Sequence, residues 1–233
     1  MEAISPEIVP GAAVVPLPPC WLAVCARRMR AHRRFKFIGL TAIMSGFFFA
    51  YFMVLRHPYY AVTVVPSTGF DRWIGFHPLA LPLYLSLWVY LSIPPWLLDD
   101  RRQLIAYGLA TVGICGVGLA IFFFWPTVLP RPDIDWNRYP GFTFLKGIDR
   151  SGNACPSLHV AFAIFSALEI DRPLRRLGAG GGIRLLNAAW ALGILYSTLA
   201  IKQHVAVDVL AGAALGAAGA ALHGAYARRA FPA

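Results

Sequence analysis

Long runs of apolar residues, separated by short polar segments, fill the chain from residue 37 almost to its end. A helix needs roughly 20 apolar residues to cross a bilayer, and most of these runs approach that length. The pattern therefore predicts an all-α fold, a polytopic membrane protein built as a bundle of six transmembrane helices. The six predicted segments are Phe37–Leu55, Pro78–Leu98, Leu104–Trp125, Pro156–Ile170, Ile183–Ile201 and Val205–Tyr226.

Two of these segments are irregular. Pro156–Ile170 is short for a full span, so we expect it to begin inside a protein cavity or to tilt at its end. Proline lacks the backbone N–H that an internal helix position donates. Pro82 and the pair Pro94-Pro95 therefore predict a kink or an early end in the second segment.

The composition excludes an ordinary soluble domain, because 58% of the residues are hydrophobic, 14% are charged and the mean hydropathy is +0.59. Six segments with their connections nearly use up the 233 residues, so we expect one compact membrane unit without a second soluble domain. The predicted organisation is a cytoplasmic N-terminal tail and basic anchor over 1–36, a six-helix transmembrane domain over 37–226 and a cytoplasmic C-terminal tail over 227–233.

The first 26 residues are rich in proline and carry two charged residues, both Glu, before a basic run over residues 27–36. A cleaved signal peptide places its charges first and its apolar region after them. The order found here predicts an unstructured tail followed by a cytoplasmic anchor.

The net charge of +10 comes from 21 Lys and Arg against 11 Asp and Glu, which in a soluble domain would suggest nucleic acid as a partner. The basic residues instead cluster between the apolar runs, as topology signals do, so we expect no nucleic-acid partner. With both termini cytoplasmic, the inner segments hold 14 of the 21 basic residues. The positive-inside rule then predicts an integral protein of a bacterial inner (plasma) membrane, with the outer loops facing the periplasm or exterior.

The four cysteines, Cys20, Cys25, Cys115 and Cys155, form no C-x-x-C pair and show no metal-ligand spacing. The sequence therefore predicts neither a disulfide framework nor a zinc site.

The first polar motif is Asn153-Ala154-Cys155-Pro156-Ser157-Leu158-His159, which leads directly into an apolar run. Proline favours the first position of a helix, so Ser157 and His159 are expected in the first helical turn. Unpaired backbone N–H groups and the positive end of the helix dipole lie there and suit a bound phosphate.

The second motif contains His204 and Asp208, four positions apart. On a helix the two share one face, so the carboxylate can hold one ring N–H and leave the other nitrogen as a nucleophile or base. Asp208 is predicted about one turn inside the membrane, where an ionised carboxylate costs roughly 2.5–3.5 kcal/mol on insertion scales unless it is paired. A partner such as His204 would explain its presence.

Each feature also has a purely structural interpretation. A single interfacial His is usually a boundary residue, and a His–Asp pair at this spacing is often a simple helix hydrogen bond. Arg131-Pro132 alone is most simply a turn with a solvated charge. The small residues Gly212, Gly216 and Gly219 favour close helix packing rather than a phosphate loop. Only the ordered combination of motifs favours a catalytic site.

That combination resembles the three signature motifs of the type 2 phosphatidic acid phosphatase superfamily, K-x6-R-P, P-S-G-H and S-R-x5-H-x3-D. The corresponding residues are Arg131-Pro132, then Pro156-Ser157-Leu158-His159, then Ser197 with His204-x-x-x-Asp208. The Leu at the third place of the second motif resembles the branch that includes inositol phosphorylceramide synthases, which pass the phosphoryl group to an alcohol.

The resemblance implies a metal-independent lipid phosphatase without a cofactor. His204 would attack phosphorus and form a phosphohistidine, Asp208 would orient it, and His159 would protonate the leaving oxygen. Ser157 and Arg131 would hold the phosphate oxygens. Fixed donors of this kind stabilise the charge of the transferring group.

Two cations of the family pattern are absent from their usual places, because Phe124 stands at the Lys position and Thr198 at the Arg position. A phosphate site without cations loses much of its electrostatic stabilisation. Lys202 is the best substitute because it adjoins His204, and Ser197 and Thr198 could add neutral hydrogen bonds. Arg138, Lys146 and Arg150 are further candidates.

We thus expect hydrolysis of a phosphomonoester or pyrophosphate of a lipid in the bilayer, at the outer membrane face. The first alternative is a phosphotransferase of the same fold that uses an alcohol acceptor. A transporter with a His–Asp proton relay and a catalytically silent protein that binds lipid headgroups are the others. The expected partners are the lipid substrate and the surrounding membrane lipids.

Overall fold

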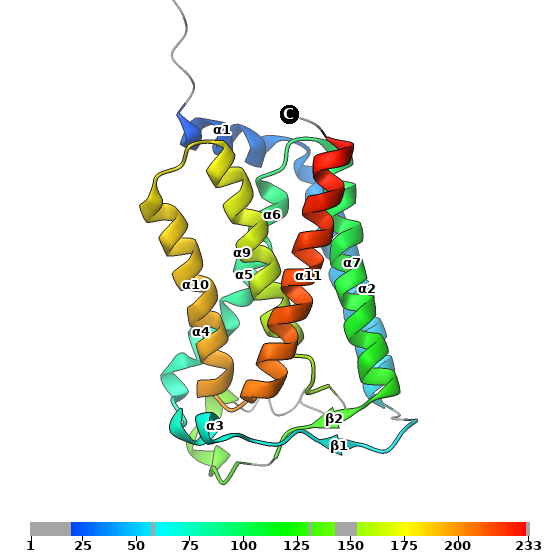
Figure 1. Cartoon of the computed structure of the whole chain (residues 1–233), viewed down its shortest axis with the longest axis vertical. Helices are drawn as coiled ribbons and strands as arrows, with labels where there is room; N and C mark the ends of the chain where they lie inside the picture. Colours follow the sequence, from blue (N-terminus) through cyan, green and yellow to red (C-terminus); the bar gives the residue numbers. More distant parts are fainter. Residues whose placement is uncertain (1–19, 57–58, 131, 143–152, 232–233) are drawn as a thin grey trace, which may run out of the picture.

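The structure, a computed structural model, describes residues 20–56, 59–130, 132–142 and 153–231. It is an all-α bundle whose long helices run side by side, with a short helix across one end and loops at the other (Figure 1). The long helices are α2 (Arg33–Arg56), α7 (Arg101–Phe124), α9 (Leu158–Arg176), α10 (Gly181–Ala200) and α11 (Ala206–Ala230). The chain is a polytopic integral membrane protein.

Five helical stretches among the described residues are long and apolar enough to cross a membrane: Arg33–Arg56, Pro78–Trp96, Arg101–Phe124, Gly181–Ala200 and Ala206–Ala230. By length and composition, the described residues therefore contain five candidate membrane spans instead of the predicted six. The exception is α9, whose second half carries Glu169, Asp171 and Arg172. It packs between α10 and α11, and Val160, Ala163 and Phe165 are completely buried. Protein neighbours surround α9, which relaxes the need for an apolar surface.

The predicted break in the second segment is confirmed. It consists of η1 (Pro78–Ala80), α4 (Leu81–Leu85), α5 (Leu87–Tyr90) and α6 (Ile93–Trp96). Pro82 lies at the start of α4, and Pro94 and Pro95 lie in α6. Each proline removes a backbone donor, so no long ladder of helix hydrogen bonds forms. The Ser86 hydroxyl between α4 and α5 donates to the Leu83 carbonyl and accepts from the Trp190 indole.

The expectation of an unstructured tail is wrong for its last part, because residues Trp21–Arg30 form α1. This helix lies across the end of the bundle (Figure 1). Its Val24 is buried, and Arg28 donates to the Leu97 carbonyl at 3.2 Å and pairs with Asp99 at 3.6 Å. Tertiary contacts of this kind stabilise a helix too short to be stable alone.

The predicted close packing at the glycines of α11 is confirmed: Gly212 and Gly216 pack against α9, and Gly219 packs against Ile114 of α7. A Cβ atom at Gly212 would lie 2.2 Å from the carbonyl oxygen of Ser157, and one at Gly216 would lie 2.2 Å from that of Ala161. Any larger residue would force the helices apart, so these positions set the α9–α11 distance.

A loop layer covers the end of the bundle opposite α1 (Figure 1). It contains β1 (Thr63–Val64), α3 (Gly69–Trp73), β2 (Thr127–Val128), η2 (Trp136–Arg138) and η3 (Pro140–Phe142). The two strands pair in parallel, and Thr127 also bridges to Asn153. Phe142 is buried against Phe76. The described part of the long polar loop thus packs onto the helices, while residues 143–152 of this expected lid lie outside the described residues.

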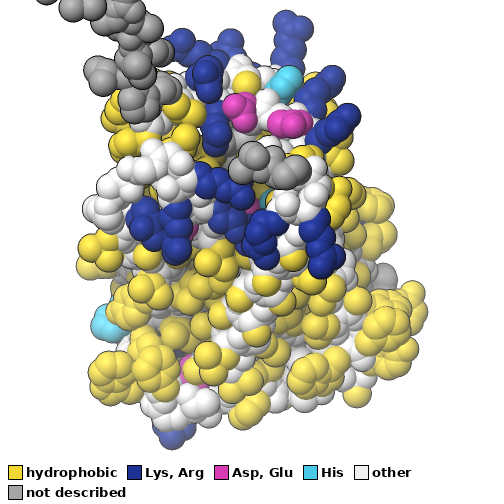
Figure 2. Space-filling view, turned by 45° about the horizontal axis from the view of Figure 1, so that its top comes forward, with side chains coloured by type: hydrophobic (Ala, Val, Ile, Leu, Met, Phe, Trp, Pro, Cys, Tyr) yellow, Lys and Arg dark blue, Asp and Glu magenta, His cyan; other side chains and the backbone are white. Residues whose placement is uncertain are grey.

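The two ends of the bundle differ in charge. Figure 2 shows Lys and Arg side chains gathered over the end that carries α1 and the last turn of α11. The exposed basic residues at this end include Arg30, at the end of α1, and Arg33 and Arg34, at the start of α2. They also include Arg228 and Arg229, at the end of α11. The opposite, loop end carries both polar motifs.

Candidate active site

The two predicted motifs meet where α9 and α11 begin. The backbone N–H of Ser157 donates to the backbone carbonyl of Asp208 at 3.0 Å. His159 and His204 both line one cavity. Close packing of the two helices therefore unites residues that are about 45 positions apart in the sequence.

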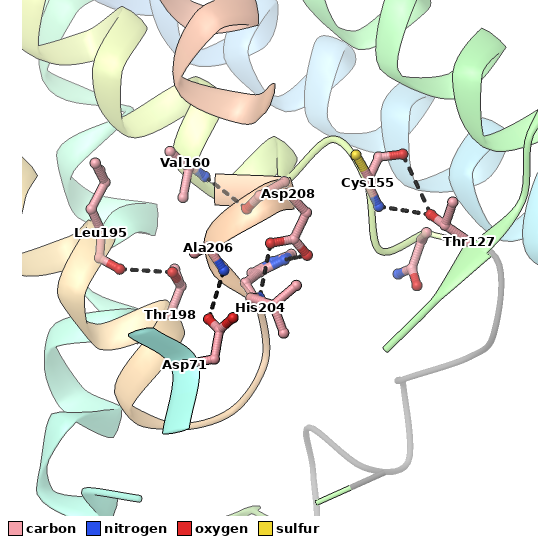
Figure 3. Close-up of polar contacts among 12 residues, drawn as sticks. Asp71, Thr127, Cys155, Val160, Leu195, Thr198, His204, Ala206 and Asp208 are labelled. Atoms are coloured by element: carbon pink, nitrogen blue, oxygen red, sulfur yellow. Dashed lines mark hydrogen bonds and ion pairs between the residues drawn. The ribbon is translucent and has the colours of Figure 1, made fainter. Parts of the chain in front are cut away.

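His204 and Asp208 form the expected pair. Nδ1 of His204 lies 2.9 Å from Oδ2 of Asp208, and the backbone N–H of Val205 donates to Oδ1 at 2.9 Å (Figure 3). Asp208 is completely buried, whereas 12% of the His204 side chain is exposed. An ionised carboxylate accepts only, so Nδ1 carries the proton and Nε2 keeps its lone pair. This is the arrangement that a histidine nucleophile needs.

His159 lies in the first turn of α9, as predicted, but its ring is already engaged. Its Nε2 lies 3.0 Å from the backbone carbonyl oxygen of Tyr84, and the ring stacks on the Tyr84 ring at a centroid distance of 3.9 Å. A carbonyl only accepts, so Nε2 carries a proton and Nδ1 is the unprotonated nitrogen of the neutral ring.

Pro156 is not the first helical residue, which corrects that detail of the prediction. Ser157 is the N-cap of α9, and its hydroxyl oxygen accepts from the backbone N–H of Val160 at 3.2 Å. A serine at this position satisfies a helix-end donor that would otherwise lack a partner. Ser157 is completely buried and does not line the cavity.

Ser197 and Thr198 do not line the cavity, although both were predicted to contact phosphate. Their buried hydroxyls donate to the carbonyls of Ile194 at 2.6 Å and Leu195 at 2.7 Å, one turn earlier in α10. Small hydroxyl side chains in helices commonly bond back in this way. The Thr198 carbonyl also accepts from the backbone N–H of His204 at 3.1 Å, so Thr198 helps to fix the turn that carries His204.

Lys202 lines the cavity beside His204, but most of its donors are already used. Its ammonium group donates to the carbonyls of Asp71, at 2.7 Å, and Ile74. An ammonium has three N–H groups, so one remains. Burial lowers the pKa of Lys202, and the charge of Asp71 partly opposes that shift.

The other candidate cations are less well placed or fall outside the description. Arg138 has 78% of its side chain exposed, pairs with Asp135 at 3.2 Å and does not line the cavity. Arg131, Lys146 and Arg150 lie outside the described residues, although Pro130 and Pro132 line the cavity.

Asp71 is a polar residue of the site that the sequence did not single out. Its carboxylate is buried in the loop layer and accepts from the backbone N–H of Ala206 at 2.7 Å, between His204 and Asp208 in the sequence (Figure 3). The one local sign is Thr68-x-x-Asp71, a capping box. That pattern predicts a helix start, not a contact with α11.

The cavity has a volume of about 1260 Å³ and is mainly apolar. It runs between α2, α7 and the broken second span, from Lys36 near α1 to His159 and His204 at the loop end. Lys36 and Tyr51, both on its wall, are 15 residues apart on α2, or about 22 Å at 1.5 Å per residue. The histidines thus lie at one end of a long hydrocarbon-lined groove.

Within the described part of the chain, no group of three or more His, Cys, Asp or Glu side chains is arranged to hold a metal ion. The chemistry that can be read from this site is that of the His204–Asp208 pair, His159 and hydrogen-bond donors.

Comparison with known proteins finds one protein family that the chain matches. Residues 103–230 match a family model described as the PAP2 superfamily. No curated protein and no solved structure matches the chain. The matched stretch contains α9, α10 and α11 with both histidines and Asp208, whereas α2 and the loop with Asp71 precede it.

Proposed function

The chain belongs to the PAP2 superfamily, whose members are phosphatases or related phosphotransferases, and from this premise we propose that it is a membrane lipid phosphatase. The proposed reaction removes phosphate from a phosphomonoester or pyrophosphate of a lipid. One observation carries the proposal: the His204–Asp208 pair and His159 lie together at the end of an apolar groove between membrane helices.

The proposed mechanism has two steps. Nε2 of His204 attacks phosphorus and forms an N–P bond while the P–O bond to the lipid breaks. With the anionic phosphate bound, Nδ1 of His159 takes up a proton and gives it to the leaving oxygen, while the Tyr84 carbonyl keeps Nε2–H. Water then attacks phosphorus and the N–P bond to His204 breaks, while Nδ1 of His159 takes the proton that the water loses. Phosphate leaves and His204 is restored. Asp208 keeps Nδ1 protonated and stabilises the positive ring.

The proposed phosphate ligands are the one unused N–H of Lys202 and Arg131, whereas Ser157 caps α9 and does not line the cavity. Fixed donors around the three equatorial oxygens stabilise the charge that develops in phosphoryl transfer. Lys202 supports this assignment by lining the cavity next to His204.

The groove supports a lipid as the substrate. Its walls carry aromatic and aliphatic side chains such as Phe47, Trp88 and Leu109. Of the residues in the spanning stretch of α2, only 6% are buried inside the protein, whereas 33% of those in α7 are. Helix α2 therefore borders both the groove and the membrane. A substrate can enter sideways and keep its chains in hydrocarbon while its headgroup meets His204. Phosphatidic acid, phosphatidylglycerol phosphate, a polyprenyl pyrophosphate and a lipid-A-type headgroup all have suitable chemistry.

The charge distribution supports an orientation. Basic side chains gather at the end that carries α1 and the last turn of α11 (Figure 2). The positive-inside rule places such an end in the cytoplasm. The loop layer and the site then face the periplasm or exterior of a bacterial inner membrane.

The decisive experiment measures phosphate release by the purified protein from a panel of lipid phosphates and pyrophosphates, with a chelator present and with added alcohols in parallel. His204→Ala should abolish release, whereas His77→Ala should not, because His77 is exposed at the same end and does not line the cavity.

Three outcomes would change the proposal. Release that continues in His204→Ala would overturn the nucleophile. A phosphorylated alcohol without free phosphate would identify a transferase. The absence of both products from wild type would refute an enzymatic function and favour transport or lipid binding.

A further inference from the structure

Asp71 lies in α3, in the loop between the first two spans, and 7% of its surface is exposed. It precedes residues 103–230, so it lies outside the region matched to the family. A buried carboxylate is costly unless hydrogen bonds compensate it, and both oxygens of Asp71 have donors.

The two oxygens serve different elements. Oδ2 accepts from the backbone N–H of Thr68 at 2.6 Å and from its hydroxyl at 2.7 Å, which closes the start of α3. Oδ1 accepts from the N–H of Ala206 at 2.7 Å, across a separation of 135 residues. Ala206 is the first residue of α11, two positions from His204 and two from Asp208 (Figure 3).

A second set of bonds joins the same two segments. Lys202 donates to the carbonyls of Asp71, at 2.7 Å, and Ile74. The His77 N–H donates to the Ala200 carbonyl at 2.8 Å. Lys202 also has a φ of 58°, a left-handed backbone that a non-glycine residue adopts only at some cost. The turn over residues 200–206 is thus tied to the 68–77 loop on both sides of His204.

The first turn of α11 depends on two carboxylates. Oδ1 of Asp208 accepts a hydrogen bond from the backbone N–H of Val205, and Oδ1 of Asp71 accepts one from the backbone N–H of Ala206. Because Asp71 is not among the residues that line the cavity, it does not contact a substrate there. Its contacts act on the backbone that holds His204.

We propose that Asp71 is a positioning residue for His204. Together with Lys202 it forms a latch, defined here as the contacts of Asp71 and Lys202 that join the 68–77 loop to the 200–206 turn. The latch fixes the direction in which Nε2 of His204 meets the groove. The inference rests on the proposed function, because it assigns His204 the role of nucleophile.

The test compares Asp71→Ala with Asp133→Asn, which removes a carboxylate charge from an exposed position at the same end. Misplacement of a reacting group by about 1 Å can cost on the order of 10²-fold in rate. We expect kcat and the rate of phosphoenzyme formation to fall about 10²-fold in Asp71→Ala, while KM changes less than about twofold. Asp133→Asn should match wild type. A wild-type kcat for Asp71→Ala would overturn the proposal.

Asp71→Asn keeps the result interpretable if Asp71→Ala fails to fold. It retains an acceptor for Ala206 but presents an amide to the two donors of Thr68, so kcat should lie between those of wild type and Asp71→Ala. A fall in kcat of about 10²-fold or more, in a variant that keeps the acceptor for Ala206, would count against the latch.

Chemical modification tests the latch without turnover. Diethyl pyrocarbonate modifies accessible imidazoles, and mass spectrometry can compare His204 with His32, which is exposed near α1 and far from the latch. Loosening of the turn should speed modification of His204 several-fold in Asp71→Ala and leave His32 unchanged. An unchanged His204 rate would refute the latch whether or not the enzyme is active. Absence of phosphatase activity from wild type would instead refute the proposed function.

Discussion

The helix pairs α9–α11 and α2–α7 have opposite characters. In the first pair, glycines bring the backbones so close that a Cβ atom at Gly212 would lie 2.2 Å from the Ser157 carbonyl oxygen. In the second pair, α2 borders a groove of about 1260 Å³, and Gly39 and Gly46 have open space around them. The groups proposed for chemistry lie on the tight pair, and the proposed lipid contacts lie on the open one.

This difference teaches how one bundle can meet two requirements. A nucleophile must be held within about 0.5 Å of its productive position, and the α9–α11 packing and the carboxylate of Asp208 would hold the proposed nucleophile, His204, in this way. A lipid chain needs apolar surface and room to move, which α2 offers because it packs mainly against α7. Substitutions in the two pairs should therefore have different kinetic consequences.

The largest expected effect is that of Asp208→Asn on the tight pair. An amide can present N–H to Nδ1 of His204, and the ring then takes the tautomer that protonates Nε2 and blocks attack. We expect kcat to fall about 10³-fold or more, measured by phosphate release under saturating substrate. A rate near wild type would mean that Asp208 has a structural role only.

Gly212→Ala should have the next largest effect. The added methyl group meets the backbone of Ser157, whose N–H bonds the Asp208 carbonyl. Separation of the helices should lower the free energy of unfolding by about 1–3 kcal/mol and kcat by about 10²-fold.

Gly46→Ala is the matched control on α2, because a Cβ there meets nothing within 4 Å. It should leave both kcat and the melting temperature unchanged. Equal sensitivity of the two glycines would remove the contrast between the two helix pairs.

A third prediction concerns the open pair. Phe48 lines the groove and contacts Trp88 with ring centroids 5.6 Å apart, whereas its neighbour Phe49 is 71% exposed and does not line the groove. Phe48→Ala should raise KM for a lipid substrate by about 3- to 10-fold, the loss of roughly one aromatic contact. Its kcat for a water-soluble phosphate ester should be unchanged. If Phe49→Ala gave the same increase, the groove would not be the lipid site.

The smallest effect is a pH dependence at Lys202. Burial lowers the pKa of this lysine, so it loses its charge at a lower pH than an ordinary lysine does. If it binds phosphate, KM should rise on the alkaline side as the pH passes through that lowered pKa and the positive charge disappears. Lys202→Arg keeps its charge throughout and should flatten this rise. An identical alkaline profile in both proteins would exclude Lys202 as the titrating ligand.

The sequence best predicts those features that depend on the spacing of neighbouring residues. The apolar runs locate α2, α7, α10 and α11 to within a few residues, and the prolines predict the broken second span. The contact between His204 and Asp208 was also predicted, but the reason was incomplete. His204 lies two residues before α11, so the turn that precedes the helix, and not a shared helix face, brings it to Asp208.

Local spacing could not predict the contacts between segments that are far apart in the sequence. The bond from Asp71 to Ala206 spans 135 residues, and nothing in either local sequence indicates it. Ser197 and Thr198 were predicted from motif position alone, but their hydroxyls had carbonyl partners one turn away in their own helix. The short helix α1 depends on Arg28, Leu97 and Asp99 being neighbours, which only the folded bundle provides.

The groove has a consequence for how turnover depends on concentration. If the substrate is the proposed lipid, it reaches His204 from between α2 and the broken span by diffusion in two dimensions, whereas the water of the proposed hydrolysis arrives from the aqueous loop side. The concentration that governs saturation is then the mole fraction of substrate in the membrane plane. Dilution of a vesicle suspension at constant lipid composition leaves the turnover of each enzyme molecule unchanged, but dilution of the substrate with inert lipid slows it.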